Sequence, residues 1–166
     1  MSESAPALGF LALTSMDDVC EMLWADGPSI RLINGGLSRT SGQQPLWLDL
    51  QRVEALGGLG VDEQGLMRLG ASLRLEHLAE DEGLRRKGRL LALACDRLGG
   101  IQWRRRASLG GVVLRAGDGQ GLAGVLECLD AVAVLRARDR ERRLPMLAGR
   151  RLSLEPDELL ESLRFP

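Results

Sequence analysis

Apolar residues recur along the chain with two different periods, one typical of helices and one typical of strands. Between Met16 and Leu23 they follow the i, i+3, i+4, i+7 spacing of one helical face, with Ser15 as a typical N-cap before them. Similar patterns predict further helices at residues 70–78, 84–98 and 122–129. Short apolar runs between turn residues predict strands at residues 30–33, 46–50, 59–61, 66–69, 131–135, 143–146 and 151–154, and a short turn at residues 156–160. Helices and hairpins mix without regular βαβ alternation, which indicates an α+β fold.

Length and composition change this picture little. The 166 residues suit one domain, and with three Trp, two Phe and no Tyr the core is expected to consist mainly of Leu, Val and Ala. No apolar run approaches the roughly 20 residues of a membrane helix. The N-terminus lacks the layout of a signal peptide. The expected location is therefore the cytoplasm, away from membranes.

Charge is distributed unevenly, although the net charge is only −1. The first half of the chain is acidic and the second half basic, which allows an anionic ligand, a nucleic acid or an acidic partner on the second half. The most basic segment, residues 136–143, contains Asp139 and Glu141 and has no aromatic neighbours for base stacking. It is interpreted as a solvated hairpin tip, and no nucleic-acid partner is expected.

Metal sites and hydrolytic sites are not expected. Cys20, Cys95 and Cys128 lie far apart and form no CxxC pair, so three buried thiols are expected instead of a metal site or disulfides. His77 is the only histidine, and its place in a short amphipathic helix indicates a solvent-facing or half-buried structural residue. No serine stands in a G-x-S-x-G context.

Two glycine pairs are candidates for an anion-binding site. Gly35 and Gly36 follow a predicted strand, and Gly110 and Gly111 follow an arginine-rich segment. Glycine permits positive φ and close approach of a ligand to the main chain, and successive N–H groups in such a bend bind anions. Two facing bends would hold a pyrophosphate from both sides, whereas either pair alone could be an ordinary turn.

The order of these features resembles the PCMH-type FAD-binding domain of the medium subunit in the molybdopterin dehydrogenase, or xanthine dehydrogenase, family. The resemblance covers nearly the whole chain, and the ordered set of motifs is specific although no single piece is. The matching segments follow one another along the chain. The helix at 15–23 comes first, NGGLS at 34–38 matches the family's A-G-G-T-D/N, and PLWLDL at 45–50 and the LGA segment at 66–79 come next. Residues 98–112 match the family's "iga.qIRN.aTlGGN", and LDAVAVL at 129–135 and residues 154–166 complete the set.

The resemblance implies a fold of two α/β subdomains with mixed and antiparallel sheets, a smaller one at about residues 1–55 and a larger one at 56–166. It implies FAD as cofactor and electron transfer from iron–sulfur centres to an acceptor. The implied partners are a molybdopterin-binding large subunit and a 2Fe-2S small subunit, and a homo-oligomer is a further possibility. The family's small C-terminal domain is not matched by any residue up to Pro166.

The resemblance also assigns the cofactor-binding residues, with Ser108 in the role of the family's Thr. The full set is Asn34, Gly35, Gly36, Leu37, Ser38, Ser108, Gly110, Gly111 and Asp118. No catalytic residue is assigned, because the substrate of this family is oxidised on another subunit.

Several family positions carry different residues here. Leu37 replaces the Thr after the first glycine pair, Arg105 and Val112 replace two Asn residues, and Gly121 replaces an Asp. Leu37 and Val112 would place apolar side chains beside the diphosphate, while Asp118 or the arginines at 104–106 could compensate. Two functions therefore remain open: an FAD-binding electron-transfer subunit, or a non-catalytic pseudo-flavoprotein that keeps the fold as a structural subunit.

Overall fold

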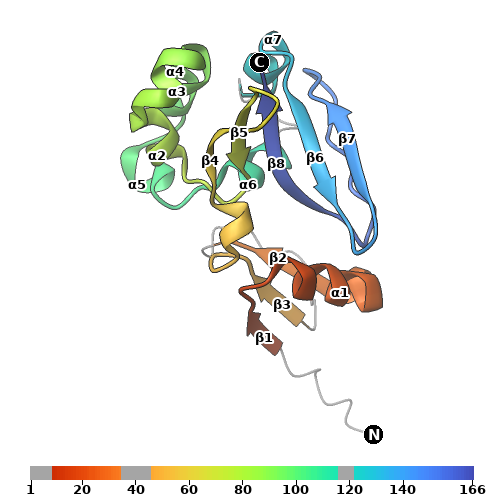
Figure 1. Cartoon of the computed structure of the whole chain (residues 1–166). Helices are drawn as coiled ribbons and strands as arrows, with labels where there is room; N and C mark the ends of the chain where they lie inside the picture. Colours follow the sequence, from red (N-terminus) through yellow and green to blue (C-terminus); the bar gives the residue numbers. More distant parts are fainter. Residues whose placement is uncertain (1–8, 35–45, 116–121) are drawn as a thin grey trace, which may run out of the picture.

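Two sheets with helices packed on them make up the protein, as Figure 1 shows for the computed structural model. The structure describes residues 9–34, 46–115 and 122–166. The smaller sheet has the order β1-β3-β2 and is parallel throughout. Its strands are β1 (Gly9–Ala12), β2 (Ile30–Ile33) and β3 (Leu46–Asp49).

Helix α1 (Met16–Asp26) connects β1 to β2 and forms as its sequence predicts. The Ser15 hydroxyl caps it by accepting from the Asp18 N–H at 3.4 Å, and the 3-10 turn Gly27–Ser29 ends it. Its buried face, Val19, Cys20 and Leu23, packs in a small core that also contains Leu159 from the larger sheet. Strand β1 was not predicted, because most of its residues are exposed and show no buried alternation.

The larger sheet is antiparallel with the order β4-β5-β8-β6-β7. Its strands are β4 (Leu59–Val61), β5 (Met67–Gly70), β6 (Val132–Arg136), β7 (Glu141–Pro145) and β8 (Leu159–Phe165). A parallel and an antiparallel sheet beside several helices confirm the α+β class. The boundary of the two subdomains near residue 55 stays a prediction.

Strand β8 corrects the prediction for the end of the chain. Residues 151–154 form no strand. The turn predicted at 156–160 is present at 156–157, but from Leu159 the chain enters β8, which lies between β5 and β6. Six of its seven residues are buried, so the strand lacks the alternation of a half-exposed strand. The buried Glu161 lies 3.2 Å from Arg68 and 3.3 Å from Arg136, which compensates its charge.

Six short helices pack near the larger sheet, and a large core lies between them and the sheet. They are α2 (Leu75–Glu80), α3 (Glu82–Lys87), α4 (Arg89–Arg97), α5 (Ile101–Arg104), α6 (Leu109–Val113) and α7 (Leu122–Cys128). His77 is exposed on α2, as expected. None of the helices in the described part of the chain has the length and apolar character needed to cross a membrane.

The single helix predicted at 84–98 is wrong, because Gly88 divides it into α3 and α4. Gly88 has φ −123° and ψ 44°, outside the helical region. A Cβ at this position would stand 2.9 Å from the Phe165 ring and 2.8 Å from a Leu84 methyl group. The break therefore lets the backbone approach the end of β8 closely.

The turn between β6 and β7 lies within the arginine-rich segment, as predicted, but ion pairs hold it to the rest of the chain. Arg138 lies 2.8 Å from Glu21 and over the Trp24 ring at 4.2 Å, both on α1. Arg140 donates to both carboxylate oxygens of Asp157 at 2.8 Å. The hairpin tip thus connects α1 to the larger sheet.

The burial of the three cysteines predicts which of them react with a thiol reagent. Cys20 and Cys95 are buried and Cys128 is exposed, which corrects the expectation of three buried thiols. Burial raises the pKa of the Cys20 thiol, and it raises the pKa of Cys95 to about 12, so both stay protonated and inaccessible at neutral pH. Mass spectrometry after brief maleimide treatment should show one label on the native protein and three in denaturant. Rapid double labelling of the native protein would contradict this.

Candidate functional site: a pocket between the two sheets

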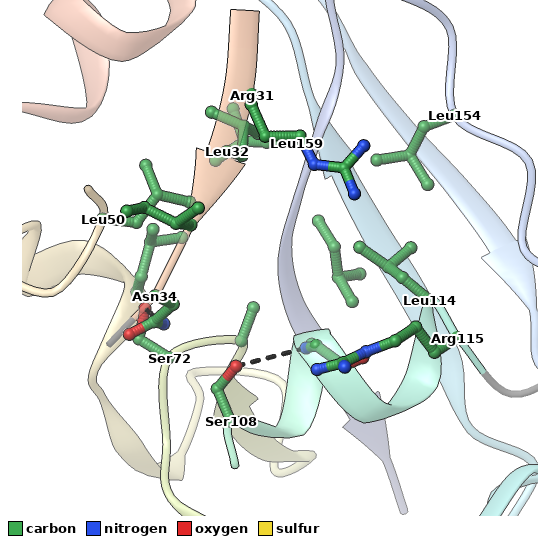
Figure 2. A pocket seen from close by; sticks show the side chains of 16 residues that line it. Arg31, Leu32, Asn34, Leu50, Ser72, Ser108, Leu114, Arg115, Leu154 and Leu159 are labelled. Carbon is green, nitrogen blue, oxygen red and sulfur yellow. Dashed lines mark hydrogen bonds between the residues drawn. The ribbon is translucent and has the colours of Figure 1, made fainter. Parts of the chain in front are cut away.

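A pocket of about 430 Å³ lies where the end of β2 faces α6 and β8 (Figure 2). Most of its lining is apolar. The lining residues are Arg31, Leu32, Ile33, Asn34, Leu50, Leu56, Ala71, Ser72, Ser108, Gly110, Gly111, Leu114, Arg115, Leu154, Leu159 and Leu160. The volume is in the range of small-molecule and cofactor sites.

Asn34 forms one wall of the pocket, at the point where β2 ends and the first glycine pair begins. Its side-chain amide donates to the Ser72 hydroxyl at 2.6 Å. Arg74 donates to the Asn34 carbonyl and to its Oδ1, each at 3.2 Å. These contacts fix the orientation of Asn34 and of the chain that leads into Gly35.

Arg74 also reaches the chain that leads into the opposite wall. Its Nη1 donates to the Arg106 carbonyl at 2.6 Å, just before the segment that contains the second glycine pair. Burial lowers the pKa of Arg74, which the Asp49 carboxylate opposes, and the guanidinium remains charged. One side chain therefore connects the two segments that the sequence proposes for binding a pyrophosphate.

Ser108 begins the opposite wall as the N-cap of α6. Its hydroxyl accepts from the Gly111 N–H at 3.2 Å, which Figure 2 marks with a dashed line. The residues on either side of Ser108 pair with the chain at the start of α2. The Leu75 N–H donates to the Ala107 carbonyl at 3.1 Å, and the Leu109 N–H donates to the Leu73 carbonyl at 2.8 Å. Because the hydroxyl accepts in this bond, its own proton remains available to donate.

The second glycine pair is not the bend that the sequence predicts. Gly110 and Gly111 lie inside α6, and neither has positive φ. The Gly110 N–H donates to the Ala71 carbonyl at 2.8 Å, so the expectation that it presents a free donor is wrong. Glycine is needed at 110 for packing, since a Cβ there would stand 2.9 Å from the Ala71 Cβ.

Four of the predicted site residues meet in this pocket: Asn34, Ser108, Gly110 and Gly111. Gly35, Gly36, Leu37, Ser38 and Asp118 lie outside the described residues. Val112 does not line the pocket, contrary to expectation, because its side chain is buried in the large core. An apolar residue at 112 therefore does not stand in the way of a ligand.

Two arginines in the pocket were missed by the sequence prediction. Arg31 on β2 and Arg115 after α6 line different sides of the pocket (Figure 2), and among the described residues none of the sixteen that line it is a carboxylate. Arg104 lies 2.7 Å from Glu76 and donates to the Asp96 and Gly99 carbonyls at 2.8 and 3.1 Å. Arg105 and Arg106 are exposed and do not line the pocket, so the basic run at 104–106 is not its source of positive charge.

The pocket thus combines apolar walls with cationic and hydroxyl groups. Such a site suits a ligand that has an apolar ring system and a negatively charged part, because each part finds a matching surface. No signal in the local sequence marks Arg31 or Arg115, since the segments that carry them meet only in the folded chain.

Comparison with known proteins identifies the family of this chain and proteins that share its fold. A family model described as "FAD binding domain in molybdopterin dehydrogenase" matches residues 6–166. A xanthine dehydrogenase FAD-binding subunit from Escherichia coli O157:H7 is 26% identical over 154 residues, which are 87% of this chain and 53% of the relative. The chain therefore spans about half the length of that relative.

Solved structures share the fold. Quinoline 2-oxidoreductase from Pseudomonas putida 86 superposes with a TM-score of 0.86 at 23% identity, over 98% of this chain and 60% of that chain. Carbon monoxide dehydrogenase from Hydrogenophaga pseudoflava superposes with a TM-score of 0.85 at 22% identity, over the same shares. The similarity extends over both sheets, because 98% of this chain is covered in each case.

Proposed function

The chain belongs to the family of FAD-binding domains in molybdopterin dehydrogenases, and from this premise we propose that it binds FAD in the pocket between its two sheets. In this role it would act as the electron-transfer domain of the medium subunit of a molybdenum hydroxylase. The observation that carries the proposal is the meeting of Asn34, Ser108 and Gly111 in one pocket with apolar walls and two arginines.

The residues of the pocket fit the cofactor. A Cβ at Gly111 would stand 2.9 Å from the Ser108 hydroxyl and 3.4 Å from Arg115, so glycine keeps the surface of α6 open to a ligand. Ser108 would donate its hydroxyl proton to a phosphate oxygen. Arg74 would hold Asn34 in position at the edge of the pocket. The apolar walls at Leu114 and Leu159 would exclude water from the ring system.

When bound, FAD supplies the ability to accept and release electrons, and the chain supplies position and environment. No side chain of the pocket needs to act as a catalytic acid or base in this role. The proposed partners are a molybdopterin-binding large subunit and a 2Fe-2S small subunit, in the cytoplasm, with homo-oligomerisation as a further possibility. The domain is proposed to comprise a small subdomain up to about residue 55 and a larger one after it.

Flavin binding by the purified chain tests the proposal directly. The expected result is the visible absorption of oxidised flavin in the purified protein, or saturable quenching of flavin fluorescence when FAD is added to colourless protein. The matched control is the same titration with protein unfolded in denaturant. A folded chain that takes up no FAD would instead assign the alternative role, a pseudo-flavoprotein that serves as a structural subunit.

A further inference from the structure

We propose that the surface formed by α3, α4 and α5, which is basic and partly apolar, binds the acidic side of α1 on a second copy of this chain. We refer to residues 83–106 as the basic surface and to the exposed side of α1 as the acidic surface. The inference goes beyond flavin binding, since the described residues that line the pocket include none of the side chains that carry it.

The positive charge of the second half of the chain is concentrated in the basic surface. Residues 83–106 contain eight arginine or lysine residues and one acid, Asp96, whereas residues 107–166 contain nine residues of each sign. When the four acids at residues 76–82 are counted as well, the cations still outnumber the carboxylates by three. The cations of this surface include Lys87, Arg89 and Arg105, which are all exposed. The surface therefore attracts an anionic partner.

Exposed leucine side chains stand among these cations. Leu90 and Leu93 are 48% and 47% exposed on α4, while Leu91, Ala92 and Cys95 on the same helix are buried. Because residues three apart are neighbours on a helix surface, the two leucines form one small apolar patch. An apolar centre with a charged rim is the arrangement found in protein–protein interfaces.

A hollow of about 220 Å³ opens beside Leu93, between α2, α3 and α4. Two arginines of the basic surface, Arg85 and Arg89, form part of its wall together with Asp96. Guanidinium groups bind carboxylates and also stack on aromatic rings. The hollow therefore suits a protruding aromatic or acidic side chain of a partner.

Helix α1 presents side chains of both kinds. It contains no basic residue, and its four exposed acids are Asp17, Asp18, Glu21 and Asp26. Trp24 lies between the last two of them and is 57% exposed, although Arg138 lies over its ring at 4.2 Å. Arg138 also pairs with Glu21 at 2.8 Å, so it compensates one of the four carboxylates.

The two surfaces cannot meet within one chain. Figure 1 shows α1 on the opposite side of the molecule from α3, α4 and α5. A second copy brings an acidic surface to the basic surface, so that opposite charges and apolar side chains meet. Because the two surfaces differ, the contact is heterologous, and each dimer keeps one free surface of each kind unless the arrangement closes.

Sedimentation velocity over a series of protein concentrations measures this association. At about 0.05 M salt the full chain is expected to self-associate with a dissociation constant on the order of 10–100 µM, because exposed charges around a small apolar patch bind weakly. At about 0.5 M salt the affinity should fall tenfold or more, since ions screen exposed charges.

Arg89→Glu and Asp26→Lys each reverse one charge, on the basic and the acidic surface respectively. Arg89 is the first residue of α4 and Asp26 the last residue of α1, so each new charge suits the helix dipole and both variants should fold. Each should self-associate about 5- to 30-fold more weakly than the wild type. Circular dichroism would verify that they are folded.

Arg150→Glu is the matched control for Arg89→Glu. It makes the same change in net charge at an exposed position outside both surfaces. Its self-association should stay within about twofold of the wild type, because a distant exposed charge is screened. A loss as large as that of Arg89→Glu would show that net charge alone governs association, and would overturn the proposal.

An equal mixture of Arg89→Glu and Asp26→Lys is the decisive measurement. The first variant keeps an intact acidic surface and the second an intact basic surface, so mixed dimers should form within about twofold of wild-type affinity. Recovery in the mixture, with each variant weak alone, supports direct contact between the two surfaces. A mixture as weak as its components overturns it.

A wild-type chain that stays monomeric at low salt also overturns the proposal. If that monomer binds anionic phospholipid vesicles or a DNA duplex, and Arg89→Glu weakens the binding, the basic surface belongs to that ligand instead. Flavin uptake is a separate readout, because a chain that takes up no FAD can still associate through these surfaces.

Discussion

Gly70→Ala is expected to lower the free energy of unfolding by about 2–4 kcal/mol, because overpacking against rigid backbone is costly. Gly70 ends β5 where the chain passes close to the 3-10 turn Glu54–Leu56. An added Cβ would collide with the Leu56 carbonyl oxygen and stand 2.6 Å from its carbon and 3.0 Å from the Gly58 nitrogen. These are backbone atoms, so no side-chain rotation can relieve the contact.

Urea denaturation followed by circular dichroism would measure the effect of Gly70→Ala, and the melting temperature should fall by roughly 5–15 °C for a chain of this size. Gly60→Ala is the matched control in the neighbouring strand β4, since nothing lies within 4 Å of a Cβ there. The control should be neutral or slightly stabilising. Equal stability of both variants would show that the close approach at Gly70 is absent.

Arg74→Met is expected to cost about 2 kcal/mol of stability, since three hydrogen bonds from a charged donor are lost and only part of that loss is regained from water. The substitution keeps an unbranched apolar stem but removes the guanidinium and its contacts to Asn34 and to the Arg106 carbonyl. Because these contacts connect the two walls of the pocket, FAD affinity should fall by about tenfold or more, the consequence of misplacing both walls.

Chemical denaturation and an FAD titration on the same variant would measure both consequences of Arg74→Met. Arg74→Lys is the informative comparison, because a single ammonium cannot reach Asn34 and Arg106 with the geometry of a guanidinium. It should recover the charge but little of the affinity. Full recovery by lysine would mean that the charge at position 74, and not the bridge between the walls, is what the pocket requires.

Local patterns were sufficient to predict α1, β2 and the β4–β5 hairpin. In α1 the apolar spacing, the N-cap at Ser15 and the glycine at 27 all indicate the same boundaries, and the structure follows them. In such segments each local preference agrees with the tertiary fold. Strand β8 was not predicted from its sequence pattern, because a strand buried on both faces shows no alternation of apolar and polar residues. Its buried Glu161 is compensated by arginines that are distant in sequence.

The pocket was predicted only in part, for a related reason. The sequence indicated the two glycine segments, and Asn34, Ser108 and Gly111 do line one pocket. The physical role assigned to Gly110 was wrong, since glycine there serves close packing against Ala71 and its N–H is already used. Arg31 and Arg115 carry no local signature, because their significance arises only when β2 and α6 are brought together by the fold.

The central place of β8 has a kinetic consequence. The hairpins β4–β5 and β6–β7 do not pair with each other, and only β8 connects them, through contacts such as Arg68 with Arg164. Closing loops between partners so distant in sequence is slow, so the sheet is expected to assemble well after its hairpins. Until β8 inserts, each hairpin presents an unpaired edge to other chains, and this interval is when the protein is most exposed to aggregation.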